Sequence, residues 1–174
     1  MNKLSSIYKL WLGLILVSCL TSCKTTFNFT GVPAGGDDGL ETIAIDLFGN
    51  QAPVVVPNLA QEFTQQLQDR FIGQSRLTLI ASDADVNVSG AITQYRISPV
   101  AISGDERAAQ NRLTIGVKVT YENVVNPDDS WDQTFSSFVD FDSDLDFISI
   151  EQEKISEIVE QLTQDIFNKS LGKW

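Results

Sequence analysis

The chain contains two cysteines, Cys19 and Cys23, whose spacing could serve a disulfide, part of a metal site, a redox pair or covalent lipid attachment. The residues 20–22, Leu-Thr-Ser, directly before Cys23 are typical of a lipobox, the bacterial signal for acylation of the cysteine thiol and cleavage before it. A second lipobox at 16–19 would place the lipid on Cys19. We favour Cys23, because it leaves the longer apolar run before the cleavage point. A disulfide is disfavoured, because both thiols would lie at the edge of a removed segment.

The segment before the cysteines has the plan of a signal peptide. Lys3 and Lys9 precede a short apolar run at 10–17 and then small residues. This run is shorter than the roughly 20 apolar residues that a membrane-spanning helix needs. We therefore predict a lipoprotein signal peptide at 1–22, a lipidated N-terminus and tether at 23–40, and a single domain at 41–174. Several acyl chains, palmitate among them, would hold the mature protein stably on a membrane.

The residues needed for common catalytic sites are scarce. The chain has no histidine, and acylation of Cys23 would remove the last thiol of the mature protein. Catalysis by Ser/His/Asp or Cys/His groups and the usual zinc ligand sets are therefore excluded. We expect a protein that is not an enzyme and that needs no cofactor.

An acidic stretch after residue 140 raises the alternative of a calcium site. Asp142, Asp144, Asp146 and Glu153 reproduce positions one, three, five and twelve of an EF-hand loop. The sixth position, which needs glycine for its sharp turn, is Phe147, and a strand rather than a helix is expected before the loop. We therefore favour acidic residues at a helix N-terminus, where the helix dipole stabilises negative charge.

The net charge of −11 limits the possible partners. A surface with this excess of carboxylates repels nucleic acid and anionic lipid, so no nucleic-acid partner is expected. Binding of any anionic ligand would need a local basic cluster or bridging divalent cations.

The elements that position these residues follow from hydrophobic periodicity. Apolar side chains alternate with polar ones in four segments, and they recur at helical spacing in two others. Pro57 or Asn58 would begin the first helix and Gly73 would end it, while Ser149 and Gln152 form a capping box for the second. The pattern predicts strands at 42–48, 86–93, 112–121 and 131–141, and helices at 57–73 and from 149 to just before 172.

This order, β-α-β-β-β-α, predicts an α+β fold. Three consecutive strands with short connections are typical of an antiparallel meander. Two amphipathic helices can cover only one face of such a sheet. We therefore expect a four-stranded, mostly antiparallel sheet with both helices packed on one face.

The other face of the predicted sheet would be polar and rich in hydroxyl groups. A solvated face is the ordinary outcome for an antiparallel sheet, and a partner surface is the functional alternative. Arg112 and Lys118 fall on this face, and Arg107 lies in the hairpin loop that precedes the predicted strand at 112–121. These three residues are the candidate contacts to a partner or ligand, whereas Arg96 cannot be assigned to a face, because Pro99 disturbs the strand nearby.

Four segments together resemble the LptE family of lipopolysaccharide-assembly lipoproteins. No segment is a catalytic signature, so the specificity lies in their combination and order along nearly the whole mature chain. Phe27 stands where tyrosine is expected. The segments are FNFTG at 27–31, GAITQYRISPVAI at 90–102, NRLTIGVKVTYEN at 111–123 and QLTQDIFNKSLGKW at 161–174.

The resemblance implies a sheet with two helices on one face and an anchor in the inner leaflet of the outer membrane, with the domain facing the periplasm. It also implies a role as plug and assembly partner of the large β-barrel LptD, and possible binding of lipopolysaccharide. The alternative function is a periplasmic envelope scaffold lipoprotein that serves a different complex through the same sheet.

Overall fold

The computed structural model describes residues 39–100 and 110–171, and all structural statements refer to these residues. Cys19, Cys23 and Arg107 lie outside them. In chain order the elements are β1 (Thr42–Ile45), β2 (Gly49–Asn50), α2 (Leu59–Gln74), β3 (Thr78–Leu79), β4 (Val86–Val100), β5 (Gln110–Asn123), a 3-10 turn (Pro127–Asp129), β6 (Trp131–Asp142) and α3 (Phe147–Leu171).

The α+β class is confirmed, but the prediction of a four-stranded, mostly antiparallel sheet is wrong. The described sheet has six strands in the order β3-β1-β4-β5-β6, with β2 beside β4. β1 and β2 run parallel to β4, and β1 runs parallel to β3, so the sheet is mixed. A crossover through a helix returns the chain in its original direction, and α2 makes β1 and β4 parallel in this way. β2 and β3 have two residues each, too few to show an alternating pattern.

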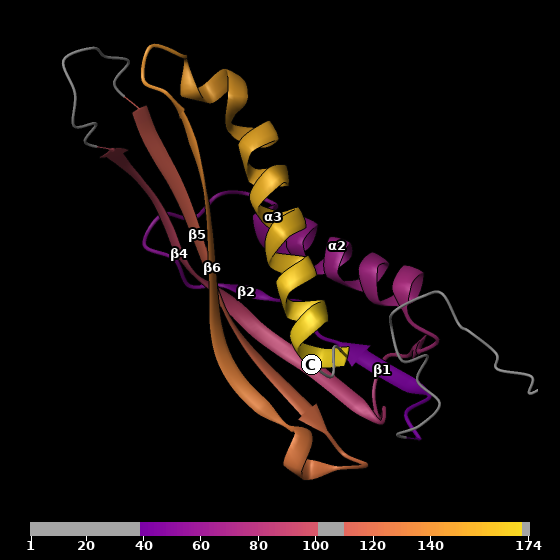
Figure 1. The fold of residues 1–174 in the computed structure, drawn as a ribbon. Coiled ribbons are helices and arrows are strands. Elements are labelled where there is room, and N and C mark those ends of the chain that lie inside the picture. The colour runs from indigo at the N-terminus through magenta and orange to yellow at the C-terminus, as the bar shows by residue number, and fades with distance from the viewer. Residues whose placement is uncertain (1–38, 101–109, 172–174) are drawn as a thin grey trace, which may run out of the picture. The chain divides into compact units, whose positions relative to one another are not determined.

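Both helices lie on the same side of the sheet (Figure 1). The alternation expected for β5 is confirmed, because Leu113, Ile115, Val117 and Val119 are completely buried beneath the helices. Two hydrogen bonds fix α3 on the strands: the Tyr95 hydroxyl donates to Glu151 over 2.6 Å, and the Ser137 hydroxyl donates to Gln161 over 2.8 Å.

The apolar stripe of α2 fills the core from the helix side. Phe63, Leu67 and Phe71 have no exposed surface, and Phe63 packs edge-on against Phe48 with ring centroids 4.9 Å apart. Complete burial of such a side chain contributes about 1.5–3 kcal/mol to the free energy of unfolding. The buried hydroxyl of Thr64 accepts the backbone N–H of Phe48 over 3.0 Å, and this bond joins α2 to the segment after β1.

Asn58 takes the N-cap position of the first helix, as one of the two predictions had it, whereas the predicted cap of the second helix differs. α2 begins at Leu59 after Asn58, whose φ of 63° lies in the left-handed region and whose side chain makes no capping bond. α3 begins at Phe147, two residues before the expected cap, so the prediction of a capping box at Ser149 is wrong. Asp146 accepts the N–H of Ile148 with its side chain over 3.3 Å and therefore takes the capping role.

A β-bulge in β4 changes which residues face the helices. The pairing with β5 shifts between Ile92 and Gln94, so Thr93 is the extra residue. Before the bulge Val86, Val88 and Ile92 are buried, and after it Tyr95 is buried. The bulge therefore reverses the relation between odd or even numbering and the two faces of the strand.

No helix among the described residues is long and apolar enough to cross a membrane.

Candidate partner surface on the open sheet face

The face of β4, β5 and β6 opposite the helices is here called the open face. Its residues follow from the strand register, in which side chains directly opposite each other share a face. From one end to the other, the rows are Ser98–Arg112–Asp140, Arg96–Thr114–Phe138, Gln94–Gly116–Ser136, Ala91–Lys118–Thr134, Ser89–Thr120–Asp132 and Asn87–Glu122.

Arg112 lies on the open face as predicted and is held in place by its neighbours. Its guanidinium donates two hydrogen bonds to Asp140, of 2.7 Å and 2.9 Å, and lies 3.7 Å from the centre of the Phe138 ring. The bond to Asp140 raises the pKa of Arg112, and the same bond lowers the pKa of the Asp140 carboxyl. The bidentate pair and the cation–π contact together hold the guanidinium of Arg112 by two different interactions.

Lys118 also lies on the open face and is paired with a carboxylate. Its ammonium is 3.3 Å from Asp132, which also accepts the hydroxyl of Thr120 over 3.1 Å. Both side chains of the ion pair are more than half exposed, so the pair contributes little to stability. Each basic residue predicted on this face thus has an acidic neighbour on β6, and the face is close to neutral in a strongly acidic chain.

The structure adds two residues that the sequence analysis did not place. Arg96 lies on the open face beside Thr114 and is exposed, and the bulge at Thr93 is the reason that its face could not be read from alternation. Phe138 is 51% exposed and lies on the edge strand β6, next to the row of Arg112 and Asp140. The sequence could have indicated Phe138, because it is a large aromatic residue with an even number in β6. Asp132 and Asp140 also have even numbers there.

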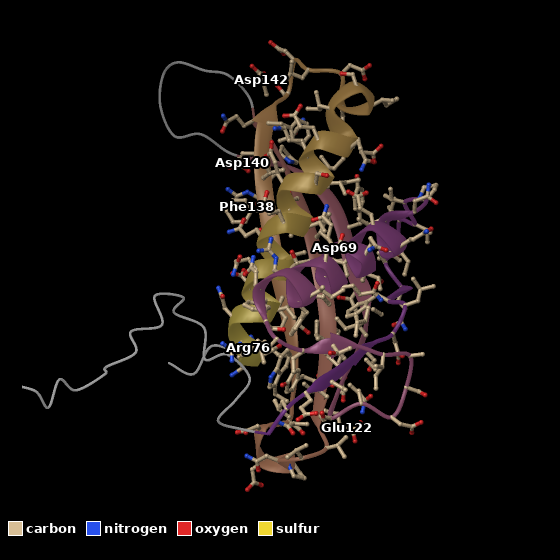
Figure 2. The ribbon with its side chains drawn as sticks, turned by 90° about the vertical axis from the view of Figure 1, so that its right-hand side faces the viewer. Asp69, Arg76, Glu122, Phe138, Asp140 and Asp142 are labelled. Carbon is tan, nitrogen blue, oxygen red and sulfur yellow. The ribbon has the colours of Figure 1, made fainter. Side chains whose placement is uncertain are left out.

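The cluster lies toward one end of the sheet. Phe138, Asp140 and Asp142 follow one another along β6, and Glu122 lies near the opposite end (Figure 2). Arg107, the third predicted contact, belongs to the segment between β4 and β5 and lies outside the described residues.

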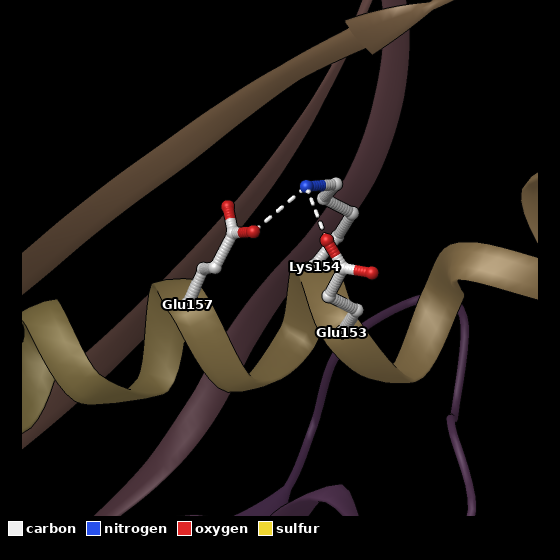
Figure 3. A network of polar contacts seen from close by, with 3 residues as sticks. All are labelled: Glu153, Lys154 and Glu157. Carbon is white, nitrogen blue, oxygen red and sulfur yellow. Dashed lines mark hydrogen bonds and ion pairs between the residues drawn. The ribbon is translucent and has the colours of Figure 1, made fainter.

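The residues of the calcium alternative are not brought together. In residues 39–100 and 110–171 no three acidic, cysteine or histidine side chains are grouped so that they could hold a metal. Asp142 accepts the N–H of Asp144 over 3.0 Å, and Asp146 caps α3. Glu153 lies on α3 and binds Lys154 over 3.0 Å, and Lys154 also binds Glu157 over 2.7 Å (Figure 3). The acidic stretch therefore terminates a strand and begins a helix.

A groove of about 610 Å³ lies between α2 and α3. Its lining is polar, and half of the lining residues are acidic, among them Asp69, Glu157 and Glu160. Arg70 is already engaged, because its guanidinium donates to Thr163, Gln164 and the carbonyl of Glu160. The groove is thus crossed by contacts between the two helices, among them the bond that the Ser156 hydroxyl donates to Glu62 over 3.1 Å.

Comparison with protein families finds a match over residues 40–170 to the model described as LptE, Lipopolysaccharide-assembly. The chain belongs to the LptE family. The predicted resemblance to the LptE family is thereby confirmed, and the segment at 27–31 lies outside the matched residues. No curated protein matches this LptE-family chain.

Several solved structures are similar to this chain at low sequence identity. A minor lipoprotein from Acinetobacter baumannii is 12% identical, covers 73% of this chain and 89% of its own, and has a TM-score of 0.48. PelC from Paraburkholderia phytofirmans is 11% identical, with coverage of 76% and 89% and a TM-score of 0.47. Protein CT253 from Chlamydia trachomatis is 12% identical, with coverage of 76% and 96% and a TM-score of 0.45.

Proposed function

We propose that this LptE-family chain is a lipoprotein of the outer membrane, acylated on Cys23, that faces the periplasm and serves as plug and assembly partner of an LptD-type β-barrel in lipopolysaccharide transport. The family match over residues 40–170 is the observation that carries the proposal. The lipobox before Cys23 supports the anchor, and the protein acts without catalysis.

The open face supports the role of a plug. A protein enclosed by a water-filled barrel needs a polar surface whose hydrogen bonds and charges are largely satisfied. The open face meets this need, because Arg112 and Lys118 are each paired with an aspartate, and the rows between them include the hydroxyls of Thr114 and Ser136. Phe138 supplies an exposed apolar anchor in this polar surroundings.

The proposal gives the role of a plug more weight than direct binding of lipopolysaccharide. Lipopolysaccharide is anionic, and a cation that already holds a carboxylate has less attraction left for a phosphate. Arg112 and Lys118 are both in this state. Arg96 has an exposed guanidinium on the same face, so any contact with an anionic ligand would begin there.

Purification of the tagged full chain in mild detergent tests the proposal. We expect a large β-barrel to be recovered with it, and depletion of the chain to reduce lipopolysaccharide at the cell surface. Recovery without any barrel, or depletion that leaves surface lipopolysaccharide unchanged, would instead favour the scaffold lipoprotein of a different complex. Mass spectrometry of the N-terminal peptide decides between acylation of Cys23 and of Cys19.

A pair of variants tests which surface meets the barrel. Phe138→Ala removes the exposed ring of the open face and should lower the recovery of barrel without lowering the melting temperature by more than a few degrees. Ile148→Ala is the matched control, because Ile148 is 83% exposed and lies on α3. If only Ile148→Ala lowered the recovery of barrel, the barrel would contact the helices rather than the open face.

A further inference from the structure

β6 is the last strand of the described sheet, and its outer side is paired with no described strand. It is 12 residues long and pairs with β5 without a bulge, from Trp131 opposite Tyr121 to Asp142 opposite Gln110. A long regular edge strand presents a row of free backbone N–H and C=O groups, which is the template for addition of another strand.

The hydrogen bonds of β4 reveal which groups of β6 point outward. The carbonyl of Val88 accepts from Asp46 beside β1, whereas the carbonyl of Asp85 accepts from Val124 at the end of β5. Backbone groups alternate in direction along a strand, so the odd residues in this part of β4 face β5.

The direction of the backbone groups in β4 also fixes their direction in β5 and β6, because two residues that lie opposite each other in an antiparallel pair both face the partner strand or both face away from it. In β5 the partners of these odd residues are even-numbered, for example Thr120 opposite Ser89, so the odd residues of β5 face β6. In β6 the odd residues therefore bond to β5, and the even ones direct their backbone groups away from the sheet. The outward residues are Asp132, Thr134, Ser136, Phe138, Asp140 and Asp142.

The far half of β4 is also unpaired on its outer side, but it is protected. After the bulge at Thr93 the outward positions are odd-numbered, and Pro99 occupies one of them. A proline offers no N–H to an incoming strand, and a bulge disturbs its register. β6 contains no proline, no lysine and no bulge, so the two edges differ in their ability to accept a strand.

The outward residues of β6 also specify the chemistry of an incoming strand. They carry three carboxylates, two hydroxyls and the exposed ring of Phe138, and no cation. Asp140 and Asp132 already bind Arg112 and Lys118 of β5, whereas Asp142 takes part in none of the described ion pairs. A second copy would place one acidic row against another in a chain of net charge −11. An aromatic or β-branched residue opposite Phe138 and basic residues opposite the carboxylates are the favourable cross-strand partners.

We propose that the outer edge of β6 receives an extended segment of another protein by strand addition, and that this segment carries basic residues at alternate positions around an aromatic or β-branched residue that meets Phe138. The inference concerns the edge of β6 and does not depend on the proposed function.

The test uses the full chain and two short synthetic peptides. One peptide alternates valine with lysine around a central tyrosine, and the other has glutamate in place of lysine. Amide hydrogen exchange measured by NMR distinguishes the two sides of β6, because odd amides already bond to β5. We expect the lysine peptide to slow exchange several-fold at Thr134, Ser136, Phe138 and Asp140, and the glutamate peptide to have no effect.

Two proline variants show whether the effect occurs at this edge. Ser136→Pro removes an outward N–H and leaves the bonds to β5 intact, so it should abolish protection by the peptide. Ile97→Pro is the matched control, because Ile97 has an outward position on β4 and is 42% exposed. This control should bind the peptide like the unaltered chain, and melting curves check that both variants remain folded.

Three outcomes would overturn the proposal. Absence of protection by the lysine peptide would show that the edge does not accept a strand. Equal protection by both peptides would show that charge does not select the partner. Protection of the even amides that grows with protein concentration and without peptide would assign the edge to a second copy of this chain.

Discussion

The guanidinium of Arg112 lies 3.7 Å from the centre of the Phe138 ring while it donates two hydrogen bonds to Asp140. The carboxylate fixes the plane of the guanidinium, and the guanidinium covers one side of the ring. Phe138 thus keeps one side for an outside partner, and the cluster joins β5 to β6 through both contacts.

Arg112→Lys should weaken this cluster although the charge is retained. A lysine ammonium cannot form the bidentate pair or stack flat on the ring. We expect a lower melting temperature and a loss of coupling between position 112 and Asp140, measured by a double-mutant cycle with Asp140→Asn. Lys118→Arg is the control, because the Lys118–Asp132 pair is more exposed, and it should leave the melting temperature nearly unchanged. Equal coupling with lysine or arginine at position 112 would contradict this view.

Gly90→Ala should destabilise the junction of β4 and β5. A Cβ atom at Gly90 would lie 2.1 Å from the carbonyl oxygen of Lys118 and 2.7 Å from the Phe48 ring. Relief of such crowding costs about 1–3 kcal/mol of the free energy of unfolding. Urea denaturation measures the change. Gly73→Ala is the control, because a Cβ there meets no atom within 4 Å and alanine stabilises a helix by roughly 0.5–1 kcal/mol.

Thr64→Val should destabilise the protein because it removes a buried acceptor. The hydroxyl of Thr64 accepts the N–H of Phe48 over 3.0 Å and donates to the carbonyl of Ala60 over 2.7 Å. Without it the buried N–H of Phe48 has no partner, at a cost of about 1–3 kcal/mol. Thr64→Ser retains the hydroxyl and should lose much less stability in the same denaturation experiment. Similar losses for both variants would show that the methyl group, rather than the hydrogen bond, matters.

Asp85 should make stability depend on pH in the acid range. Its carboxylate accepts the N–H of Glu41, the hydroxyl of Thr42 and the N–H of Thr42, and these bonds lower its pKa below the usual value of about 3.9. A carboxyl with a lowered pKa stabilises the fold fully above the usual value, and this contribution disappears as the pH falls through the lowered pKa.

The variant Asp85→Asn therefore should melt at a lower temperature near neutral pH and lose less stability than the unaltered chain on acidification. Thermal unfolding followed across the acid range measures both effects. Asp69→Asn is the control, because Asp69 accepts only an exposed bond from Gln65 within the same helix. An unchanged pH dependence in Asp85→Asn would assign the acid sensitivity to other carboxylates.

The parts of the fold that depend on periodicity could be predicted from the sequence, and the parts that depend on pairing could not. The long alternation around Ile115 and the helical stripe of Phe63, Leu67 and Phe71 were correct, because burial imposes a period on many residues at once. β2 and β3 were missed because two residues carry no period. The parallel direction of β1 could have been inferred from the helical crossover that follows it.

The open face was predicted in outline and incompletely in its chemistry. Arg112 and Lys118 were placed correctly on it by parity within β5. Their aspartate partners were not, because the register of β6 against β5 depends on the turn at 124–130 and not on alternation. Arg96 was lost for another reason, since one extra residue in β4 reverses the parity of every residue after it.

Because of the extra residue Thr93, the residues of β4 that face the core have even numbers before the bulge and odd numbers after it. Each part of the strand alternates strictly, but a single alternation does not describe both parts. Deletion of Thr93 would leave a single alternation along the whole strand, because Ile92, Gln94 and Tyr95 already pair with the consecutive residues Val117, Gly116 and Ile115. Tyr95 would stay in the core and Arg96 on the open face. A search for related chains that allows one inserted residue at this position should therefore recover the common inward pattern of β4 where an ungapped comparison loses it.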